Sequence, residues 1–103
     1  MECPFCTIRP ERILLENEHF VAIRDIHPIS PGHCLIVSRR HARDFFELSA
    51  AEASSLHDLS LKLRGLLDSG HHPDGFKLLM NCGAAAGQSV FHFHLHLIPR
   101  YTG

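Results

Sequence analysis

The sequence predicts an α+β domain in which a five-stranded antiparallel sheet carries one long helix packed on one face. Five short runs rich in Ile, Leu, Val and Phe are separated by turn residues, which is the pattern of strands. One longer segment repeats leucine at three- and four-residue spacings, which is the pattern of an amphipathic helix. The order is three strands, a helix and two strands, with loops short enough to join antiparallel neighbours. We therefore expect residues 1–103 to form a single domain.

The three predicted strands before the helix occupy residues 12–16, 19–25 and 33–38. The first two break at Asn17-Glu18, which indicates a hairpin. A loop with two prolines, closed by Gly32, leads into the third run. The third run is almost continuously apolar and is typical of a central strand covered on both faces.

The helix begins with a clear start signal and ends at a predicted stop. Ser49-Ala50-Ala51-Glu52 is a capping box, and Ser69-Gly70 is expected to end the helix. Leu61 lies off the apolar stripe, which hints that another subunit covers a second face. The stripe expected to face the core consists of Leu56, Leu59, Leu63, Leu66 and Leu67.

The chain after the helix continues with a predicted strand at residues 75–82 and a loop of very small residues. In this loop, Gly83-Ala84-Ala85-Ala86-Gly87, backbone amides can come close to a ligand, particularly an anionic one. Its place directly before a histidine-rich strand strengthens this interpretation.

Composition narrows the class of protein. The net charge of −1, without a basic block, argues against binding a nucleic acid polymer, because that affinity comes from neutralising many phosphates. No apolar run reaches membrane-spanning length, and the N-terminus lacks a signal-peptide pattern. Cys34 and Cys82 lie in apolar strand-like runs, where free buried thiols are common. We expect a cytoplasmic protein with no membrane partner.

The most informative stretch is residues 87–100, in which three histidines alternate with apolar residues and should project from one face of a strand. One possibility is a shared metal, but same-face neighbours are about 7 Å apart, so three ligands from one strand fit poorly. A second is a histidine nucleophile that attacks phosphorus, with Ser89 and amides near Gly87 stabilising the charge. A third is a pH-sensitive or structural patch. The three histidines are His92, His94 and His96.

Some other residues keep two interpretations at this level. Asp25 could accept hydrogen bonds from a sugar diol or could simply cap its turn. Cys3 and Cys6 supply half of a tetrahedral metal site, or are surface thiols without a role. His41 alone is a surface histidine by default.

The stretch Gly87-Gln88-Ser89-Val90-Phe91-His92-Phe93-His94-Leu95-His96-Leu97-Ile98 resembles the signature of the histidine-triad (HIT) superfamily. The resemblance spans nearly the whole chain. Its other parts are Asp25-Ile26, Ser30-Pro31-Gly32-His33, Asn81 and Ile98-Pro99-Arg100.

The resemblance implies a HIT-like fold, a homodimer and a nucleotide hydrolase or transferase. Such an enzyme would cleave a phosphoramidate, an adenylate or a dinucleoside polyphosphate through a covalent nucleotidyl-histidine intermediate, without an organic cofactor. The alternatives are a nucleotide-binding regulatory module with little turnover and, less favoured, a metal-dependent hydrolase. Many relatives continue beyond the histidine strand, whereas this chain stops at Tyr101-Thr102-Gly103, so the sequence leaves the choice of conjugate open.

The resemblance also assigns roles by position. His94 would be the nucleophile, His96 and Ser89 would contact the α-phosphate, and His33 would support the triad's hydrogen bonds. The implied nucleotide-binding set is Asp25, Ile26, Asn81, Gly87, Gln88, Ser89, His94 and His96. Bacterial members that resemble this chain hold a structural Zn²⁺, and the matching ligands here are Cys3, Cys6, His41 and His92.

Overall fold

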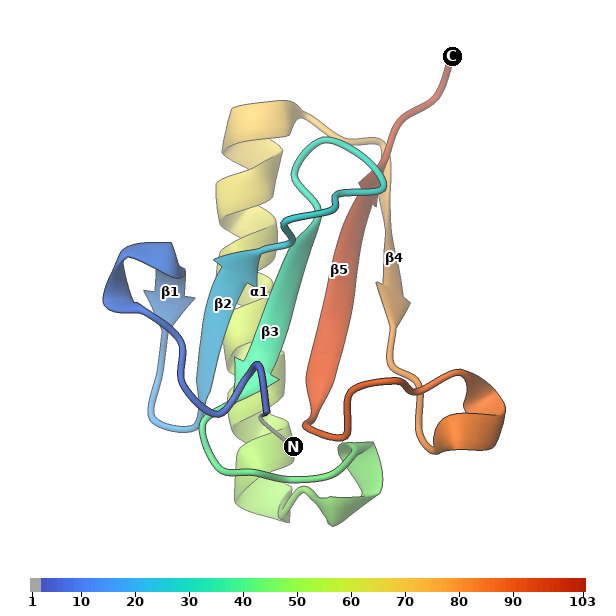
Figure 1. The fold of residues 1–103 in the computed structure, drawn as a ribbon. Coiled ribbons are helices and arrows are strands. Elements are labelled where there is room, and N and C mark those ends of the chain that lie inside the picture. Colours follow the sequence, from blue (N-terminus) through green and yellow to red (C-terminus); the bar gives the residue numbers. More distant parts are fainter. Residues whose placement is uncertain (1–2) are drawn as a thin grey trace.

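The computed structural model describes residues 3–103 as a five-stranded sheet with a single α-helix packed on one face (Figure 1). Each neighbouring pair of strands is antiparallel, in the order β1-β2-β3-β5-β4. The predicted fold class is therefore confirmed. The strands are β1 (Ile13–Glu16), β2 (Phe20–Arg24), β3 (Cys34–Ser38), β4 (Gly75–Leu79) and β5 (His94–Arg100); α1 is Ala50–His71, and the 3-10 turns are η1 (Pro10–Arg12), η2 (Phe45–Glu47) and η3 (Ala84–Ala86).

The core lies between the sheet and α1. Strand β3 is buried along its whole length, as the sequence predicted for a central strand. A second, smaller apolar cluster covers the opposite face of the sheet, where Phe5, Ile8 and Ile13 pack on residues of β2 and β3. The N-terminal segment thus crosses the face of the sheet that α1 leaves open (Figure 1).

Helix α1 begins where the sequence predicted and ends later than predicted. The Ser49 hydroxyl accepts from the Glu52 amide at 3.1 Å, and the Glu52 carboxylate accepts from the Ser49 amide at 2.9 Å, so the capping box is present. The predicted stop at Ser69-Gly70 is wrong, because the helix continues to His71 and ends at His72, whose φ is 52°. Pro73 explains this position, since the residue before a proline is disfavoured from helical backbone angles.

The apolar stripe of α1 is narrower than predicted. Leu56, Leu59, Leu63 and Leu67 are buried, but Leu66 is 47% exposed and does not belong to the core. Successive residues are offset by about 100° around a helix, so Leu66 and Leu67 cannot both point at one sheet face. Leu67 takes the buried position.

His92 lies outside β5, so the three histidines do not project in one row. Strand β5 begins at His94, and His92 occupies a bend just before it. The His92 side chain points to β3, where its Nε2 lies 2.7 Å from the Ser38 carbonyl oxygen. That bond and the neighbouring cysteines place His92 apart from the other two. Similarly, β4 ends at Leu79 and not at Cys82 as the sequence predicted.

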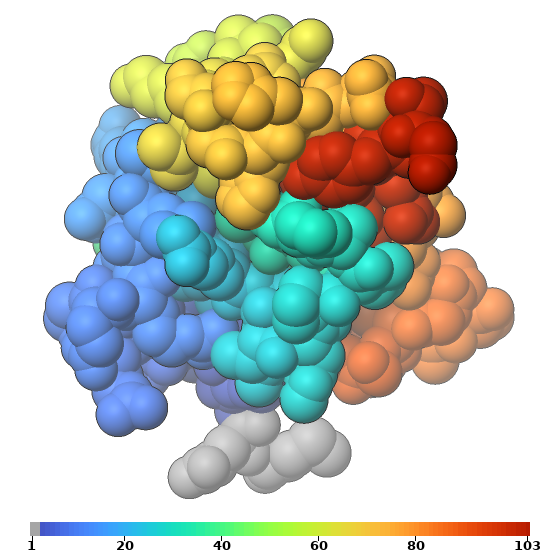
Figure 2. Space-filling model, turned by 90° about the horizontal axis from the view of Figure 1, so that it is seen from above, coloured from blue at the N-terminus to red at the C-terminus, as the bar shows by residue number. Residues whose placement is uncertain are grey.

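The loop from Asp25 to His33 lies at one end of the molecule, beside the C-terminal end of α1 and the residues that follow β5 (Figure 2). Gly32 has a φ of 88°, and a Cβ there would meet Pro99 and His71 side-chain atoms at 3.2 Å. The Tyr101 hydroxyl donates to the Pro31 carbonyl at 2.7 Å. The loop is therefore fastened beside the last strand.

Within residues 3–103, no helix combines the length and the apolar composition that crossing a membrane requires.

Candidate functional site

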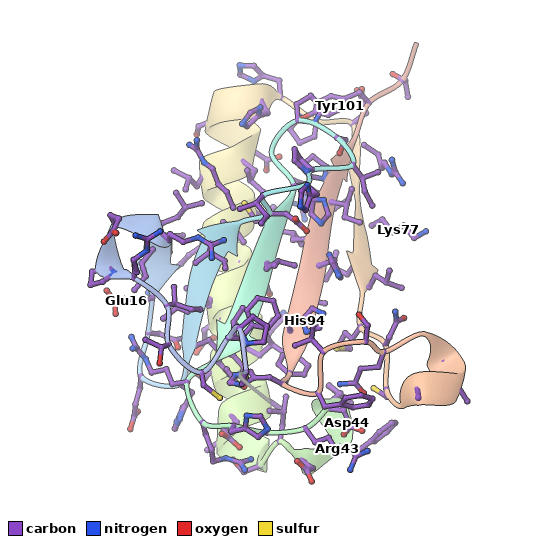
Figure 3. All side chains as sticks on the ribbon, in the orientation of Figure 1. Glu16, Arg43, Asp44, Lys77, His94 and Tyr101 are labelled. Atoms are coloured by element: carbon purple, nitrogen blue, oxygen red, sulfur yellow. The ribbon has the colours of Figure 1, made fainter. Side chains whose placement is uncertain are left out.

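Strand β5 presents His94 and His96 on the face of the sheet opposite α1. Leu95 and Leu97 alternate with them and are buried in the core beneath the helix. Both imidazoles are half-buried. His94 lies at the start of β5 (Figure 3), where side chains of β5 and the N-terminal segment meet. The period-2 pattern of the sequence thus correctly predicted the face of these two histidines.

A backbone carbonyl fixes the tautomer of His94. Its Nδ1 lies 2.9 Å from the His92 carbonyl oxygen. A carbonyl can only accept, so Nδ1 carries the proton and donates. In the neutral ring the lone pair is then on Nε2, at the far edge of the imidazole. This is the arrangement of a nucleophilic histidine whose other nitrogen is held.

His96 has the opposite tautomer, because its partner is a donor. The Ile29 amide donates to Nδ1 of His33 at 3.1 Å, which leaves the proton of His33 on Nε2. That nitrogen lies 2.9 Å from Nδ1 of His96, which therefore accepts. Nε2 of His96 must then carry a proton, and the ring offers a hydrogen-bond donor to a ligand.

Burial keeps this pair of rings neutral. Desolvation lowers the pKa of His33, although the nearby Asp25 carboxylate opposes the shift. Desolvation also lowers the pKa of His96, and the adjacent His94 and His33 contribute in the same direction. Both rings therefore remain uncharged at neutral pH, as the hydrogen-bond chain requires.

The Asp25 carboxylate lies beside the hydrogen-bonded pair His33 and His96, and it also caps the turn in which Asp25 lies. One carboxylate oxygen accepts from the His27 amide at 2.8 Å, which is the turn-capping role considered from the sequence. The other oxygen lies 3.4 Å from Nε2 of His33. Asp25 is thus placed next to the histidine pair.

Asp25, His33 and His96 bring three possible metal ligands together, but the hydrogen bonds do not favour a metal there. A metal-bound histidine normally donates its second ring N–H to an acceptor. Here the second nitrogen of His33 faces the Ile29 amide, which is a donor. Ligation through His33 would therefore break that bond.

The small-residue loop before β5 owes its shape to two glycines with positive φ and to hydrogen bonds from the side chain of Gln88. Gly83 and Gly87 have φ angles of 94° and 93°. The buried Gln88 amide accepts from the Gly83 amide at 2.7 Å and donates to the carbonyls of Arg43 and Val90 at 2.7 and 3.0 Å. Because the side chain is committed to these bonds, Gln88 shapes the loop from inside.

Of the remaining predicted nucleotide contacts, Asn81 and Ser89 lie beside this loop, and Ile26 lies on the loop between β2 and β3. The Asn81 amide lies beside Gly87, where a Cβ would come within 3.3 Å of its nitrogen. Ser89 is exposed at the end of the loop. Ile26 is 72% exposed on the Asp25–His33 loop.

The sequence did not predict two contacts of the histidines, one with the Ile29 amide and one with the Phe5 ring. The Ile29 amide, which sets the histidine tautomers, leaves no signal in the sequence because it is a backbone group. The ring of Phe5 lies 5.0 Å from that of His94, between centroids. A signal for Phe5 was present, since it lies between the two cysteines of the C-x-x-C pair.

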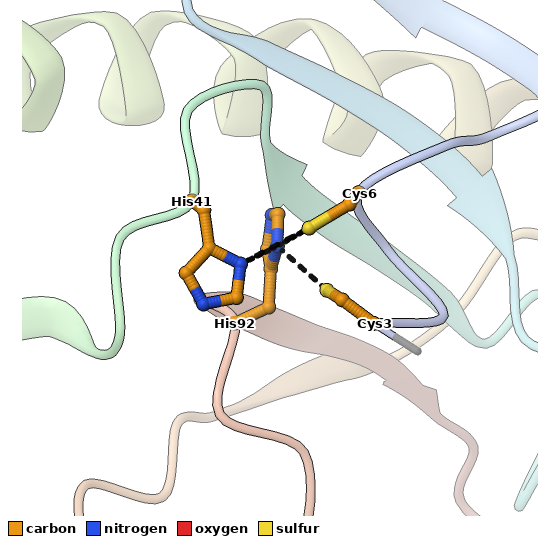
Figure 4. A group of neighbouring side chains, drawn as sticks. All are labelled: Cys3, Cys6, His41 and His92. Carbon is orange, nitrogen blue, oxygen red and sulfur yellow. Dashed lines mark hydrogen bonds between the residues drawn. The ribbon is translucent and has the colours of Figure 1, made fainter. Parts of the chain in front are cut away.

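The residues proposed for zinc converge from three distant segments (Figure 4). The sulfurs of Cys3 and Cys6 lie 3.1 and 3.5 Å from Nδ1 of His92. Nδ1 of His41 lies 3.0 Å from the Cys6 sulfur and 3.2 Å from Nδ1 of His92. A tetrahedral ion with bonds of about 2.1–2.3 Å places its ligand atoms about 3.5 Å apart. The spacing therefore fits one ion with four protein ligands.

The chemistry of the donor set also fits a metal. Nε2 of His92 donates to the Ser38 carbonyl, so the lone pair of Nδ1 faces the two sulfurs. Hydrogen bonding to the Cys3 sulfur raises the pKa of the Cys6 thiol because it stabilises the protonated form, and desolvation and repulsion from a neighbouring Cys3 thiolate act in the same direction. A bound cation would remove that conflict. Cys2His2 ligation leaves no open position, which is typical of a structural zinc.

Comparisons with known proteins show which family this chain resembles in sequence and in structure. The family model described as "HIT domain" matches residues 7–103. A crystal structure of a HIT family protein from Bacillus anthracis has a TM-score of 0.87 and 42% identity, covering 97% of this chain and 74% of that one. An uncharacterised HIT-like protein of Mycoplasma genitalium is 38% identical over 96% of this chain and 73% of its own length.

A third relative has a named activity. The adenylylsulfatase HINT3 of Arabidopsis thaliana is 34% identical over 96% of this chain, which spans 52% of that protein.

Proposed function

Because this chain belongs to the HIT domain family, we propose that it is a nucleotide hydrolase or transferase that cleaves a phosphoryl-linked nucleoside monophosphate conjugate. The conjugate would be a phosphoramidate, an adenylate or a dinucleoside polyphosphate. The observation that supports this most is the pair of opposite tautomers on β5. One imidazole offers a lone pair, and the next offers an N–H.

In the proposed first step, Nε2 of His94 attacks the α-phosphorus. The new P–N bond forms as the bond to the leaving group breaks, and the positive charge on His94 is stabilised by its Nδ1–H bond to the His92 carbonyl. Nε2–H of His96, together with Ser89 and backbone amides near Gly87, donates to the phosphoryl oxygens. Water then attacks the nucleotidyl-histidine, releases the nucleoside monophosphate and restores His94.

The other nucleotide contacts follow from their positions. Asp25 would accept hydrogen bonds from the ribose hydroxyls, Ile26 would lie near the base, and Asn81 would contact the ribose-phosphate region. Adenylyl sulfate, from which the Arabidopsis relative takes its name, is an adenylate conjugate, and this supports the same substrate class here.

The nucleophile is tested with His94→Ala and a panel containing an adenosine phosphoramidate, adenylated lysine, a dinucleoside polyphosphate and a sugar nucleotide. We expect the variant to lose at least about 1,000-fold in kcat on the best substrate. Acid quenching of wild type should trap a nucleotide on His94. The matched control is His57→Ala, which replaces an exposed histidine of α1. Full turnover by folded His94→Ala would contradict the nucleophile, and nucleotide binding without any turnover would favour the regulatory module.

We also propose that Cys3, Cys6, His41 and His92 hold one structural Zn²⁺. When bound, the ion would supply a cross-link between segments and no open coordination position for chemistry. Elemental analysis should find close to one equivalent per chain and far less in Cys3→Ser. A metal-free protein with both cysteines reduced would contradict this proposal. Loss of turnover in a zinc-stripped sample that keeps its fold and the His94 geometry would favour the metal-dependent alternative.

We further propose a homodimer. Strand β4 lies at the edge of the sheet, and Leu78 on it is 53% exposed, while Leu61 of α1 is 54% exposed. An edge strand with exposed apolar side chains can pair with a second copy. Sedimentation should give twice the mass of the chain, and a strictly monomeric protein at micromolar concentration would contradict the dimer.

A further inference from the structure

The N-terminal segment links the metal cluster to the candidate nucleophile. We propose that Phe5 is a positioning residue for His94, and that a metal bound by Cys3 and Cys6 holds Phe5 in place. The bound ion would thereby set the orientation of an imidazole that it does not ligate. The importance of His94 in this inference rests on the proposed function.

The contact itself is direct. The ring of Phe5 lies 5.0 Å from that of His94 with an interplanar angle of 53°, and 6.1 Å from that of His92 at 74°. These separations are within the range in which aromatic rings pack against each other. Phe5 is half-buried and also packs on the apolar cluster of β2 and β3. The ring therefore covers His94 from the N-terminal side.

His94 depends on such contacts for its orientation. Among residues 3–103, the His94 side chain makes one hydrogen bond, from Nδ1 to the His92 carbonyl, which leaves the ring able to tilt about that point. Ring contacts with Phe5 and with His96, whose centroid is 5.3 Å away, oppose this tilt. An attacking atom misplaced by about 1 Å can cost on the order of 100-fold in rate.

The metal ligands are what fix Phe5. Residues 3–9, the part of the segment before η1 that the structure describes, contain turns but no strand or helix, so no sheet ladder holds them. Phe5 lies between Cys3 and Cys6, whose sulfurs both face Nδ1 of His92. An ion bound there would attach both flanks of Phe5 to His92, two residues before β5. Without the ion, this turn keeps the hydrogen bond from the Cys6 amide to the Cys3 carbonyl, weak bonds to sulfur and the apolar contacts of Phe5 with the sheet.

The test observes the His94 ring directly, by ¹⁵N NMR of the histidine side chains at one fixed neutral pH. The samples are zinc-loaded wild type, Phe5→Ala, Phe5→Leu and, as a control, Ile8→Ala, which removes an apolar side chain from the same cluster. Wild type should show a single Nδ1–H tautomer. Phe5→Ala should retain one equivalent of zinc but show mixed tautomers and broadened signals at His94, with kcat about 10-fold lower.

The remaining samples separate positioning from general destabilisation. Phe5→Leu should recover part of the wild-type pattern, and Ile8→Ala should leave His94 unchanged. Removing zinc from wild type should reproduce the His94 spectrum of Phe5→Ala, whereas removing it from Phe5→Ala should change His94 little further, because the two perturbations act through one contact.

Two results would overturn the inference. One is an unaltered His94 spectrum in both Phe5 variants. The other is an equal response of His94 to zinc removal with and without Phe5. If wild type turns over no conjugate while the spectra behave as expected, the positioning role stands and the proposed reaction fails.

Discussion

The His92 carbonyl and the Ile29 amide are backbone groups, and each determines the proton position on a nearby imidazole. One forces a proton onto Nδ1 of His94, and the other, acting through His33, forces one onto Nε2 of His96. The same residue type therefore offers a lone pair at one position and a donor two residues later. The difference between a ring that offers a lone pair and a ring that offers an N–H comes from the surrounding backbone and not from the side chains themselves.

His33 should accordingly act through His96. We expect His33→Ala to lower kcat about 10- to 100-fold, because His96 then loses the donor that fixes its tautomer. His33→Gln, whose amide can donate, should recover part of the loss, which a purely structural role does not require. Steady-state kinetics and ¹⁵N shifts of His96 measure both effects. His27→Ala, an exposed histidine of the same loop, is the control. Equal losses in His33→Ala and His33→Gln would contradict this role.

The burial of His33 and His96 makes the free energy of unfolding depend on pH. Desolvation lowers the pKa of His33 and His96 below the ordinary value of 6.5, so the unfolded chain binds more protons as the pH falls below that value. The contribution to the free energy of unfolding is therefore complete above about pH 6.5 and decreases on acidification. Urea unfolding at several pH values should show this decrease, and His33→Gln should show a smaller one. An identical pH dependence in both proteins would exclude His33 as a source.

Alternation within the sequence was enough to predict the face of His94 and His96, but not the departure of His92. The strand pattern extends through His92 as clearly as through the other two. What removes it from the strand is a bond to Ser38 and contact with two cysteines that are more than eighty residues away. Local periodicity carries no information about partners at that separation.

Among the elements, the loop between β4 and β5 depends on one buried side chain. Gln88 joins the Gly83 amide to the carbonyls of Arg43 and Val90, so it connects the small-residue loop to the segment that follows His41. The sequence predicted Gln88 among the nucleotide contacts. That contact stays a prediction. The internal bonds of the side chain explain how the loop keeps its shape, and a sequence cannot reveal which way an amide side chain points.

Replacing Gln88 should therefore disturb the loop more than the strands. Gln88→Ala leaves three backbone groups without their partner, and we expect the protein to lose about 1–3 kcal/mol of unfolding free energy. Hydrogen exchange at the Gly83 amide should become much faster, while KM for the nucleotide rises. Gln88→Glu retains the acceptor for the Gly83 amide but loses the donors to Arg43 and Val90. The exchange rate of the Gly83 amide in this variant should therefore lie between the rates in wild type and in Gln88→Ala. Unchanged hydrogen exchange at the Gly83 amide in Gln88→Ala would show that the Gln88 side chain does not hold the loop in its shape.

The helix shows how local signals compete. Ser49 and Glu52 predicted its start correctly, because a capping box needs only neighbouring residues. Its end was misplaced because Gly70 is a stop signal only when the chain turns there, and here the helix continues to the last position that Pro73 allows. The sequence therefore predicted every strand and the helix, but not all of their ends.

At the scale of the whole molecule, the candidate metal site joins the N-terminal segment, which lies outside the sheet, to the neighbouring ends of two paired strands. Cys3 and Cys6 precede η1, His41 follows β3, and His92 precedes β5 (Figure 4). The ion would therefore close loops that span most of the chain. A ligand that binds only the folded state raises its stability, and removing the ion should remove that gain.

We expect chelation of the metal to lower the thermal midpoint of unfolding by on the order of 10 °C, because a domain of this size shifts by about 4–8 °C for each kcal/mol. Calorimetry of zinc-loaded and stripped protein measures the shift. Cys3→Ser should resemble stripped wild type and should not respond to the chelator, since it lacks one of the four ligands. Cys34→Ser is the matched control: it changes a buried cysteine of β3 outside the cluster and should keep the response to chelation, whatever its own midpoint. A midpoint of wild type that is the same with and without metal would mean that the four side chains meet without binding an ion that matters to the fold.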